Sequence, residues 1–231
     1  MTAVKLVRGD CMPALRAMGD NAYSLAIVDP PYGLGIDGQK SDFRHSSGKY
    51  HKSKWGRKGH DQKGWDVRPQ EEYFEQLFRV SKNQVVWGGN YFVEHISPSK
   101  GWIFWYKGQQ GLTMSDGEMA WSSFNVPTRM FTLNRMALTQ EGTIHPTQKP
   151  VKLYKWLLKN YAKPGDTILD THLGSMSSVI ACIEMGFDVT GYELDADYFK
   201  AGVDRVRRHL RQQDMFRADV DLTVVDDGGA V

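Results

Sequence analysis

Cysteine is scarce in this sequence, and that scarcity limits the chemistry it can support. Cys11 and Cys182 are the only two cysteines among 231 residues, and they lie far apart. This excludes a disulfide framework and a cysteine-built metal site. Four histidines lie in polar segments: His45, His51, His60 and His145. Their spacing does not match that of zinc ligands, and we expect no metal.

Long apolar runs are also absent. No stretch approaches the roughly 20 apolar residues that cross a membrane as a helix. The first residues, Met1-Thr2-Ala3-Val4-Lys5, do not have the pattern of a secretory signal. We therefore expect a soluble, cytoplasmic protein that contacts no membrane.

Neither sign of charge is in large excess. The chain has 29 lysines and arginines against 27 aspartates and glutamates, which gives a formal net charge of +2. A surface for an anionic partner must therefore come from local clustering. The hydrophobic fraction of 41% is sufficient for a core, and we expect a single domain over residues 1–231.

Positive charge does cluster in residues 34–69, where no periodic apolar pattern is present. Basic residues alternate there with aromatic ones such as Tyr50 and Trp55. This combination suits a phosphate-rich partner, and a solvated mobile loop is the alternative. Because the segment follows Tyr32, we favour the interpretation that it is a basic loop insertion that covers an active cleft. Residues 107–142 suggest a second, smaller insertion that faces the same partner.

Elsewhere, short apolar strands alternate with amphipathic helices. Strand patterns occur at residues 4–7, 24–28, 84–87, 102–106, 167–170 and 188–193, with shorter ones at 119–124 and 129–133. Helical patterns occur at residues 11–18, 71–80, 151–161, 179–185 and 196–212. This alternation predicts an α/β fold with a mostly parallel sheet and helices on both faces. We expect residues 213–231 to be a loose tail.

The strand at residues 24–28 runs into Asp29-Pro30-Pro31-Tyr32. Neither proline can donate to a β-ladder, so strand pairing stops there. An acidic and an aromatic side chain are thereby displayed at the carboxyl end of a buried strand, where open α/β sheets bind ligands. A simple Pro-Pro turn is the alternative. Asp10 ends the first strand in the same way and either caps the next helix or contacts a ligand.

Residues 167–193 contain a strand, a turn of small residues, a helix and a second strand that ends in Glu193. This order is typical of a nucleotide-type cofactor site, where the acidic residue is placed to bind ribose hydroxyls. Gly174 is the only glycine in the turn, whereas a pyrophosphate would favour more. The pattern therefore favours a cofactor without phosphates, such as S-adenosylmethionine.

With His145-Pro146-Thr147-Gln148-Lys149-Pro150, these motifs resemble the amino-group DNA methyltransferases. Their order, with the Asp29 motif first and the cofactor turn last, is similar to the β class. The usual turn of that class is Asp-Pro-Phe-x-Gly-Ser-Gly-Thr-Thr, and here Thr171, His172 and Met176 replace the proline, the phenylalanine and the second glycine. The resemblance implies a Rossmann-like, S-adenosylmethionine-dependent methyltransferase fold with circularly permuted motif order.

The resemblance also implies roles for individual residues. Asp29 and the Pro30 carbonyl would accept hydrogen bonds from the target amine, Pro31 would complete the motif, and Tyr32 would stack on a base flipped from duplex DNA. Cofactor-binding residues are implied at Asp10, Lys149, Pro150, Asp170, His172, Leu173, Gly174, Ser175 and Glu193. DNA contacts would come from the two insertions, through Arg44, Lys49, Lys52, Lys54, Arg57, Lys58, Lys107 and Arg129.

On this basis we expect a site-specific methyltransferase for adenine N6 in DNA, in a prokaryotic cell or a phage-infected host. Aspartate at position 29 favours adenine, because serine is commoner there in the family's cytosine enzymes. The alternatives are methylation of cytosine N4, RNA as the acceptor, and a catalytically silent DNA-binding homologue. Many relatives in this family pair into dimers, so a homodimer is also left open.

Overall fold

The computed structural model describes residues 1–35, 66–110, 115–134, 142–212 and 219–227. The chain divides into two compact units, one made of Met1–Pro30 with Gln70–Val231 and the other of Pro31–Pro69. The insertion expected at residues 34–69 falls within the second unit. Residues 36–65 of that unit lie outside the described part of the chain.

The two described ends of the second unit meet through a turn. The backbone N–H of Gly33 donates to the carboxylate of Asp66 at 2.9 Å. Gly33 has a φ of +70°, and a Cβ added there would lie 3.1 Å from Cβ of Arg68. Glycine is therefore required on both conformational and steric grounds.

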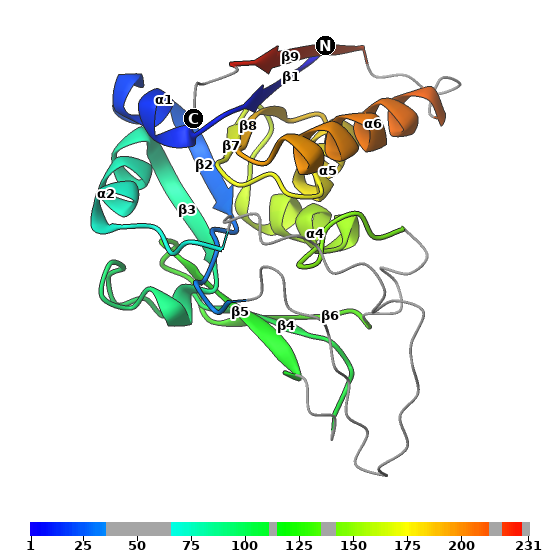
Figure 1. The fold of residues 1–231 in the computed structure, drawn as a ribbon. Helices are drawn as coiled ribbons and strands as arrows, with labels where there is room; N and C mark the ends of the chain where they lie inside the picture. The colour runs from blue at the N-terminus through cyan, green and yellow to red at the C-terminus, as the bar shows by residue number, and fades with distance from the viewer. Residues whose placement is uncertain (36–65, 111–114, 135–141, 213–218, 228–231) are drawn as a thin grey trace. The chain divides into compact units, whose positions relative to one another are not determined.

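The first unit is built on one sheet. Its described strands are β1 (Thr2–Arg8), β2 (Tyr23–Val28), β3 (Ser81–Trp87), β4 (Ile103–Tyr106), β5 (Gly117–Ser122), β6 (Arg129–Thr132), β7 (Thr167–Asp170), β8 (Asp188–Glu193) and β9 (Val220–Asp226). They lie in the order β6-β4-β5-β3-β2-β7-β8-β1-β9 (Figure 1). Among these described strands, β5 alone runs antiparallel to its neighbours. The expected α/β fold with a mostly parallel sheet is confirmed.

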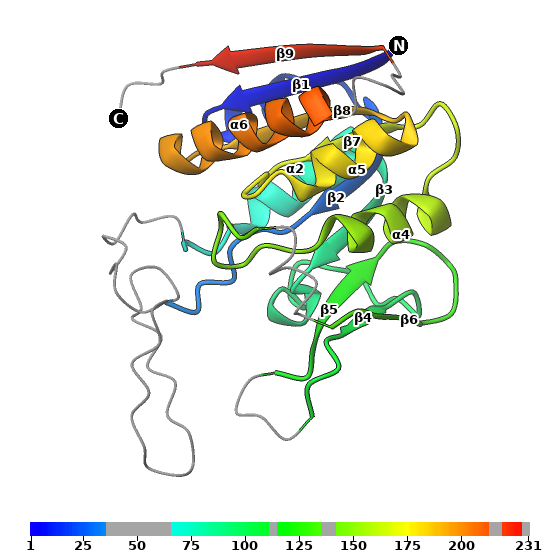
Figure 2. The same cartoon turned by 90° about the vertical axis from the view of Figure 1, so that its right-hand side faces the viewer.

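Helices cover both faces of this sheet. The described α-helices are α1 (Cys11–Ala17), α2 (Glu71–Val80), α4 (Val151–Tyr161), α5 (Ser177–Met185) and α6 (Ala196–Gln212). α1 and α2 lie on one face, and α4, α5 and α6 lie on the other (Figures 1 and 2). Each follows the helical pattern of its sequence closely, and the apolar side of α2 buries Tyr73, Phe74 and Leu77.

The core lies between the sheet and the helices. Leu6, Ile27 and Ile168 on three of the strands are almost fully buried, as are Leu153 and Leu157 of α4. Removal of this apolar surface from water is the main favourable term in folding.

The expected loose tail is wrong for residues 220–226, which form β9. β9 pairs in parallel with β1, from Thr2 opposite Val220 to Arg8 opposite Asp226. Val220, Leu222 and Val224, which alternate along β9, pack against the core. That two-residue period is a strand signal, although polar and acidic residues between the apolar ones make it weak.

Within the described residues, no helix is both long enough and apolar enough to cross a membrane.

Candidate active site

The carboxyl ends of β2 and β7 lie next to each other in the middle of the sheet. Leu25 pairs with Ile168, and Ala26 pairs with Leu169. The chain leaves β2 through α2 to β3 on one side, whereas it leaves β7 through α5 to β8 on the other. Open α/β sheets bind ligands at the carboxyl ends of strands related in this way. Asp29 and Asp170 mark these two ends.

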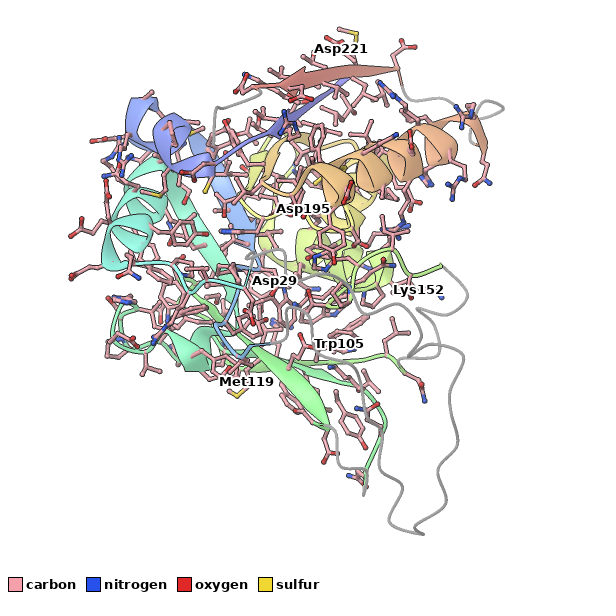
Figure 3. The ribbon with its side chains drawn as sticks, viewed as in Figure 1. Asp29, Trp105, Met119, Lys152, Asp195 and Asp221 are labelled. Carbon is pink, nitrogen blue, oxygen red and sulfur yellow. The ribbon has the colours of Figure 1, made fainter. Side chains whose placement is uncertain are left out.

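Asp29 directly follows β2, and its carboxylate accepts a hydrogen bond from Nζ of Lys149. The Lys149 side chain is 1% exposed and that of Asp29 is 16% exposed, so water has little access to this ion pair. Lys149 Nζ also lies 3.2 Å from Oε2 of Glu118 on β5 and 5.1 Å from the centre of the Trp87 ring. Figure 3 shows Asp29 where β2 ends. One buried ammonium is thus held by two carboxylates and an aromatic face.

The contacts between Lys149 and its two carboxylates affect the pKa values of Lys149 and Glu118. Burial acts to lower the pKa of Lys149, but the carboxylates of Asp29 and Glu118 outweigh burial and raise it above its ordinary value. Burial acts to raise the pKa of Glu118, but the ammonium groups of Lys149 and Lys107 lower it to about 2. Lysine and glutamate are therefore both charged at neutral pH.

Gln148 holds the segment that carries Lys149. Its side-chain Nε2 donates to the Gly142 carbonyl at 2.8 Å, and its Oε1 accepts from the backbone N–H of Ile144 at 3.1 Å. Pro150 then forms the N-cap of α4 in an extended conformation, with φ −71° and ψ 145°. The buried Gln148 and Pro150 on either side leave Lys149 a fixed backbone from which to reach Asp29.

Asp170 ends β7 and lies in a different environment. Its Oδ2 accepts from the Ser178 hydroxyl at 2.5 Å, and its Oδ1 accepts from the backbone N–H of His172 at 3.1 Å. Burial raises the pKa of Asp170 to about 7, although both hydrogen bonds act to lower it. In the described part of the chain no lysine, arginine or histidine side chain forms an ion pair with this carboxylate.

Thr171 and His172, which replace the family's proline and phenylalanine, form a polar chain with α2. Tyr73 Oη lies 2.6 Å from Thr171 Oγ1, which lies 2.9 Å from His172 Nδ1. The Tyr73 and His172 rings also meet edge to face, with centroids 5.4 Å apart. Burial lowers the pKa of His172 to about 4, so its imidazole is neutral at physiological pH. The unusual turn residues are thus hydrogen-bonded to the fold.

Glu193 closes the turn from the end of β8. Its Oε2 accepts from the backbone N–H of Gly174 at 2.7 Å, and its Oε1 accepts from that of Asp195 at 2.9 Å. Burial raises the pKa of Glu193 despite these bonds. Leu173 packs so closely on β8 that a Cβ at Gly191 would lie 2.3 Å from its Cδ2. The turn is therefore pressed against the neighbouring strand.

Met176 occupies the position of the family's second glycine and keeps a glycine-like backbone. Its φ is +58° and its ψ is 29°, which is left-handed. Its fully buried side chain lies against Gly202 of α6, where an added Cβ would come within 2.8 Å of Met176 Sδ. A glycine in the helix thus makes room for the methionine in the turn.

Arg205 of α6 supports the same turn from outside. Its Nη1 donates to the Ser175 carbonyl at 2.7 Å and to the Ser177 hydroxyl at 2.8 Å. Arg205 is buried, whereas Arg207 and Arg208 on the same helix are exposed. Of these three arginines of α6, Arg205 therefore stabilises the turn.

Asp10 lies two residues after β1, whose neighbour β8 carries Glu193. Its side chain accepts from the backbone N–H of Met12 at 3.0 Å and so caps α1. The capping role that the sequence left open is therefore present. Asp10 is exposed, and a capping carboxylate can accept further hydrogen bonds through its other lone pairs.

The remaining expected site residues are placed as follows. Pro31 and Tyr32 belong to the second unit, whereas Pro30 is buried in the first. Lys107 lies 2.5 Å from Oε1 of Glu118, and Arg129 is exposed at the start of β6. Six expected DNA contacts lie outside the described residues: Arg44, Lys49, Lys52, Lys54, Arg57 and Lys58. The described residues contain no group of three or more His, Cys, Asp or Glu arranged to hold a metal ion.

Sequence reasoning did not identify Glu118, Arg205 or Tyr73. Glu118 lies in a segment without a long regular pattern, and its partner Lys149 is distant in sequence. Arg205 fits the basic end of an amphipathic helix equally well. Tyr73 fits the apolar side of α2. A buried hydrogen-bonding role has no separate sequence signal at any of the three positions.

Comparison with protein families matches residues 62–204, more than half of the chain, to the family described as DNA methylase. Among curated proteins, the type II methyltransferase M.HpaI of Haemophilus parainfluenzae is 21% identical over 87% of this chain and 74% of its own. The DNA adenine methyltransferase YhdJ of Escherichia coli is 34% identical over 82 residues, which are 35% of this chain and 28% of its own.

Solved structures share the fold at low sequence identity. A putative DNA modification methylase from Thermus thermophilus, complexed with S-adenosylmethionine, is 14% identical over 98% of this chain and 99% of its own, with a TM-score of 0.59. The PvuII DNA methyltransferase, described as cytosine-N4-specific, is 12% identical over 100% of this chain and 97% of its own, with a TM-score of 0.56. The expected methyltransferase fold is thereby confirmed, and the chain belongs to the DNA methylase family of S-adenosylmethionine-dependent amino-group DNA methyltransferases.

Proposed function

We propose that this chain methylates N6 of adenine in duplex DNA after the base has been turned out of the helix into the site at the end of β2. The observation that carries the proposal is the half-buried carboxylate of Asp29, paired with the buried Lys149, at a strand end beside the cofactor turn. The exocyclic amine of adenine is a weak nucleophile because its lone pair is delocalised into the ring. An acceptor for its protons increases electron density on the nitrogen and stabilises the developing charge.

The cofactor turn suits S-adenosylmethionine. This ligand carries a positive sulfonium and ammonium, ribose hydroxyls and no phosphate. Carboxylates stand at the ends of three neighbouring strands, as Asp170 of β7, Glu193 of β8 and Asp10 after β1. Asp170 is buried beside hydroxyl and amide donors and has a raised pKa, so it gains from a positive neighbour. When bound, the cofactor supplies an electrophilic methyl group.

We assign the chain's own residues as follows. Asp170 would hold the positive methionine portion, Glu193 the ribose, and Asp10 the adenine end. His172, Leu173, Gly174 and Ser175 would line the turn beside the ligand. Asp29 and the Pro30 carbonyl would accept hydrogen bonds from the amine, and Tyr32 would stack on the flipped base.

Adenine is proposed over cytosine because position 29 carries aspartate. The partial match to a relative described as a DNA adenine methyltransferase supports this choice. Both amines need an acceptor and in-line placement of the methyl donor, so N4 of cytosine is the second candidate. We place the reaction in a bacterial or phage-infected cell, with DNA contacts from the second unit and from Arg129.

Transfer of radiolabelled methyl groups to mixed-sequence duplex DNA tests the proposal. Digestion to nucleosides and mass spectrometry are expected to yield N6-methyladenine. Asp29→Ala is expected to abolish transfer, whereas Asp20→Ala, which removes an exposed aspartate paired with Arg79, keeps it. N4-methylcytosine would reassign the base, transfer to RNA alone would reassign the acceptor, and no transfer to either would reject the enzyme.

A further inference from the structure

Four charged side chains of alternating sign form a continuous chain from Asp29 to the end of β4. Lys149 pairs with Asp29 and, at 3.2 Å, with Glu118. Glu118 pairs in turn with Lys107 at 2.5 Å. Asp29 follows β2, Lys149 precedes α4, Glu118 lies on β5 and Lys107 follows β4. Lysines from two separate segments of the first unit therefore meet at the carboxylate of Glu118.

The network is largely shielded from water, most completely at Lys149. The side chains of Lys149 and Lys107 are 1% and 13% exposed, and those of Asp29 and Glu118 are 16% and 29% exposed. Indole rings lie beside both ammonium groups, since Lys107 Nζ is 5.0 Å from the Trp105 ring centre. Charges removed from water are costly unless closely paired. The geometry of the pairs is therefore tightly determined.

The charges within this network cancel, because two ammonium groups face two carboxylates. This balance affects the proposed reaction, in which positive charge moves to an amine nitrogen held by Asp29. Lys149 alone would repel that charge through a medium of low dielectric. Glu118 offsets Lys149 and leaves the hydrogen bond from Lys149 to Asp29 in place. A paired lysine can thus orient the acceptor without opposing the reaction.

We infer that Lys149 and Glu118 are positioning residues for Asp29. Lys149 orients the Asp29 carboxylate through their hydrogen bond, and Glu118 cancels the positive charge beside the reacting nitrogen. Lys107 holds Glu118 in place from the second insertion, so the β4–β5 hairpin is connected to the catalytic carboxylate. This inference rests on the proposed function, and it gives Lys149 a role at the target base in place of the cofactor role expected from sequence.

The first test compares single-turnover and steady-state methyl transfer by Glu118→Gln with the unsubstituted chain. Glutamine keeps the size and the acceptor oxygen but removes the charge. We expect kcat to fall about tenfold to a hundredfold, somewhat less than on loss of a direct donor to the transition state. The KM for the cofactor should change by less than about threefold, because the lost interaction acts on the reacting amine.

The matched control is a lysine–glutamate pair outside the site. Lys155 of α4 and Glu184 of α5 are paired at 2.6 Å, with side chains 44% and 21% exposed. Glu184→Gln and Lys155→Met should leave kcat unchanged. A fall in kcat for Glu118→Gln no larger than for Glu184→Gln overturns the inference.

The pH profile of kcat separates positioning from a structural role. Among the described residues, the groups that face Asp29 and Lys149 include Glu118 on β5, Lys107 after β4, Tyr154 on α4, Tyr73 on α2 and Asp170 on β7. Lys149→Met leaves neighbouring carboxylates without the ammonium between them, so protonation becomes easier. The acidic limb should move up by about one pH unit. Lys149→Arg, which keeps the charge, should leave the limb in place with a reduced kcat.

A second readout does not depend on activity. In protein labelled with ¹³Cδ-glutamate, the Glu118 signal, assigned by its loss in Glu118→Gln, should titrate at higher pH in Lys149→Met than in the unsubstituted chain, because Lys149 lowers the pKa of Glu118. An unchanged midpoint in a folded variant overturns the role of Lys149. A chain that transfers no methyl group to any nucleic acid rejects the proposed function together with this role. A transferring chain with unaltered Glu118→Gln kinetics rejects the inference alone.

Discussion

Asp29 and Asp170 stand at the carboxyl ends of adjacent strands, yet the first has a charged hydrogen-bond donor beside it and the second has uncharged donors. Asp29 receives a buried ammonium from Lys149, whereas Asp170 receives a hydroxyl and a backbone amide. Burial raises the pKa of Asp170 to about 7. The same residue type in nearly the same place thus has a built-in cation at one strand end and neutral donors at the other.

The difference matches what each end is proposed to hold. A neutral amine brings no charge to the Asp29 site until the reaction begins, so the protein itself supplies the cation that pairs with the carboxylate. A positively charged cofactor brings its own cation to Asp170. A protein lysine at that second position would repel the ligand.

The largest expected effect comes from replacing each aspartate by its amide. Asp29→Asn should lower kcat by about 10² to 10³, because an acceptor aimed at the reacting amine is lost, while cofactor affinity is kept. Asp170→Asn should instead weaken cofactor binding by about tenfold to a hundredfold, through loss of a charged hydrogen bond. Calorimetric titration with S-adenosylmethionine and initial rates on duplex DNA measure both. If Asp29→Asn and Asp170→Asn both lower kcat alone, or both weaken cofactor binding alone, the ends of β2 and β7 do not differ in function.

The second expected effect is on stability. Lys149→Met leaves the half-buried Asp29 and Glu118 without their shared cation, and the free energy of unfolding should fall by about 2–3 kcal/mol, somewhat less than for a fully buried pair. Lys155→Met, at an exposed pair, should cost less than about 1 kcal/mol. Urea denaturation monitored by tryptophan fluorescence provides the comparison. Equal losses in the two variants would show that the buried network is no more important to the fold than a surface pair.

The third prediction concerns the cation that supports the cofactor end indirectly. Arg205→Met leaves the Ser175 carbonyl and the Ser177 hydroxyl without their donor and should destabilise the fold by about 1–3 kcal/mol. Cofactor affinity should fall with it, because the turn loses its support. Arg207→Met, on the exposed side of α6, is the matched control. Weaker DNA binding with unchanged cofactor affinity would instead place Arg205 at a nucleic-acid surface.

The smallest effect is a pH dependence of cofactor binding. A cationic ligand favours ionised Asp170, and the ionised fraction falls as pH drops below the pKa of about 7. Affinity should therefore be constant above that pH and decline below it, approaching about tenfold per pH unit. Glu193, whose pKa is raised by burial, adds to the decline at lower pH. The decline around pH 7 should disappear in Asp170→Asn, and its persistence there would assign it to another group.

Much of the fold follows from local pattern. α2 and α4 begin and end where their apolar periodicity does, because their faces are buried against one sheet. β9 was not expected, because its alternating apolar residues are separated by acidic ones and its partner β1 lies at the other end of the chain. Non-local pairing of this kind leaves little trace in a short sequence window.

The candidate site also has a part that the sequence predicts and a part that only the folded structure shows. The positions of Asp29, Asp170 and Glu193 follow from strand ends, which sequence shows well. The pairing of Lys149 with Glu118 depends on how β5 is inserted beside β3, which only the fold reveals. Met176 looks like a departure from the family's turn until Gly202 is seen to accommodate it. Compensation between distant residues is visible only after the chain has been folded.

The position of β1 between β8 and β9 has a consequence for biosynthesis. The backbone N–H of Ala3 bonds to Asp188, 185 positions later in the chain, and β9 follows later still. At about 5–20 residues per second, a ribosome needs on the order of ten seconds or more to make that interval. During this time the apolar strand with Val4 and Leu6 has no sheet to join. We therefore expect the nascent chain to be exposed to aggregation at β1 until β8 and β9 have been made.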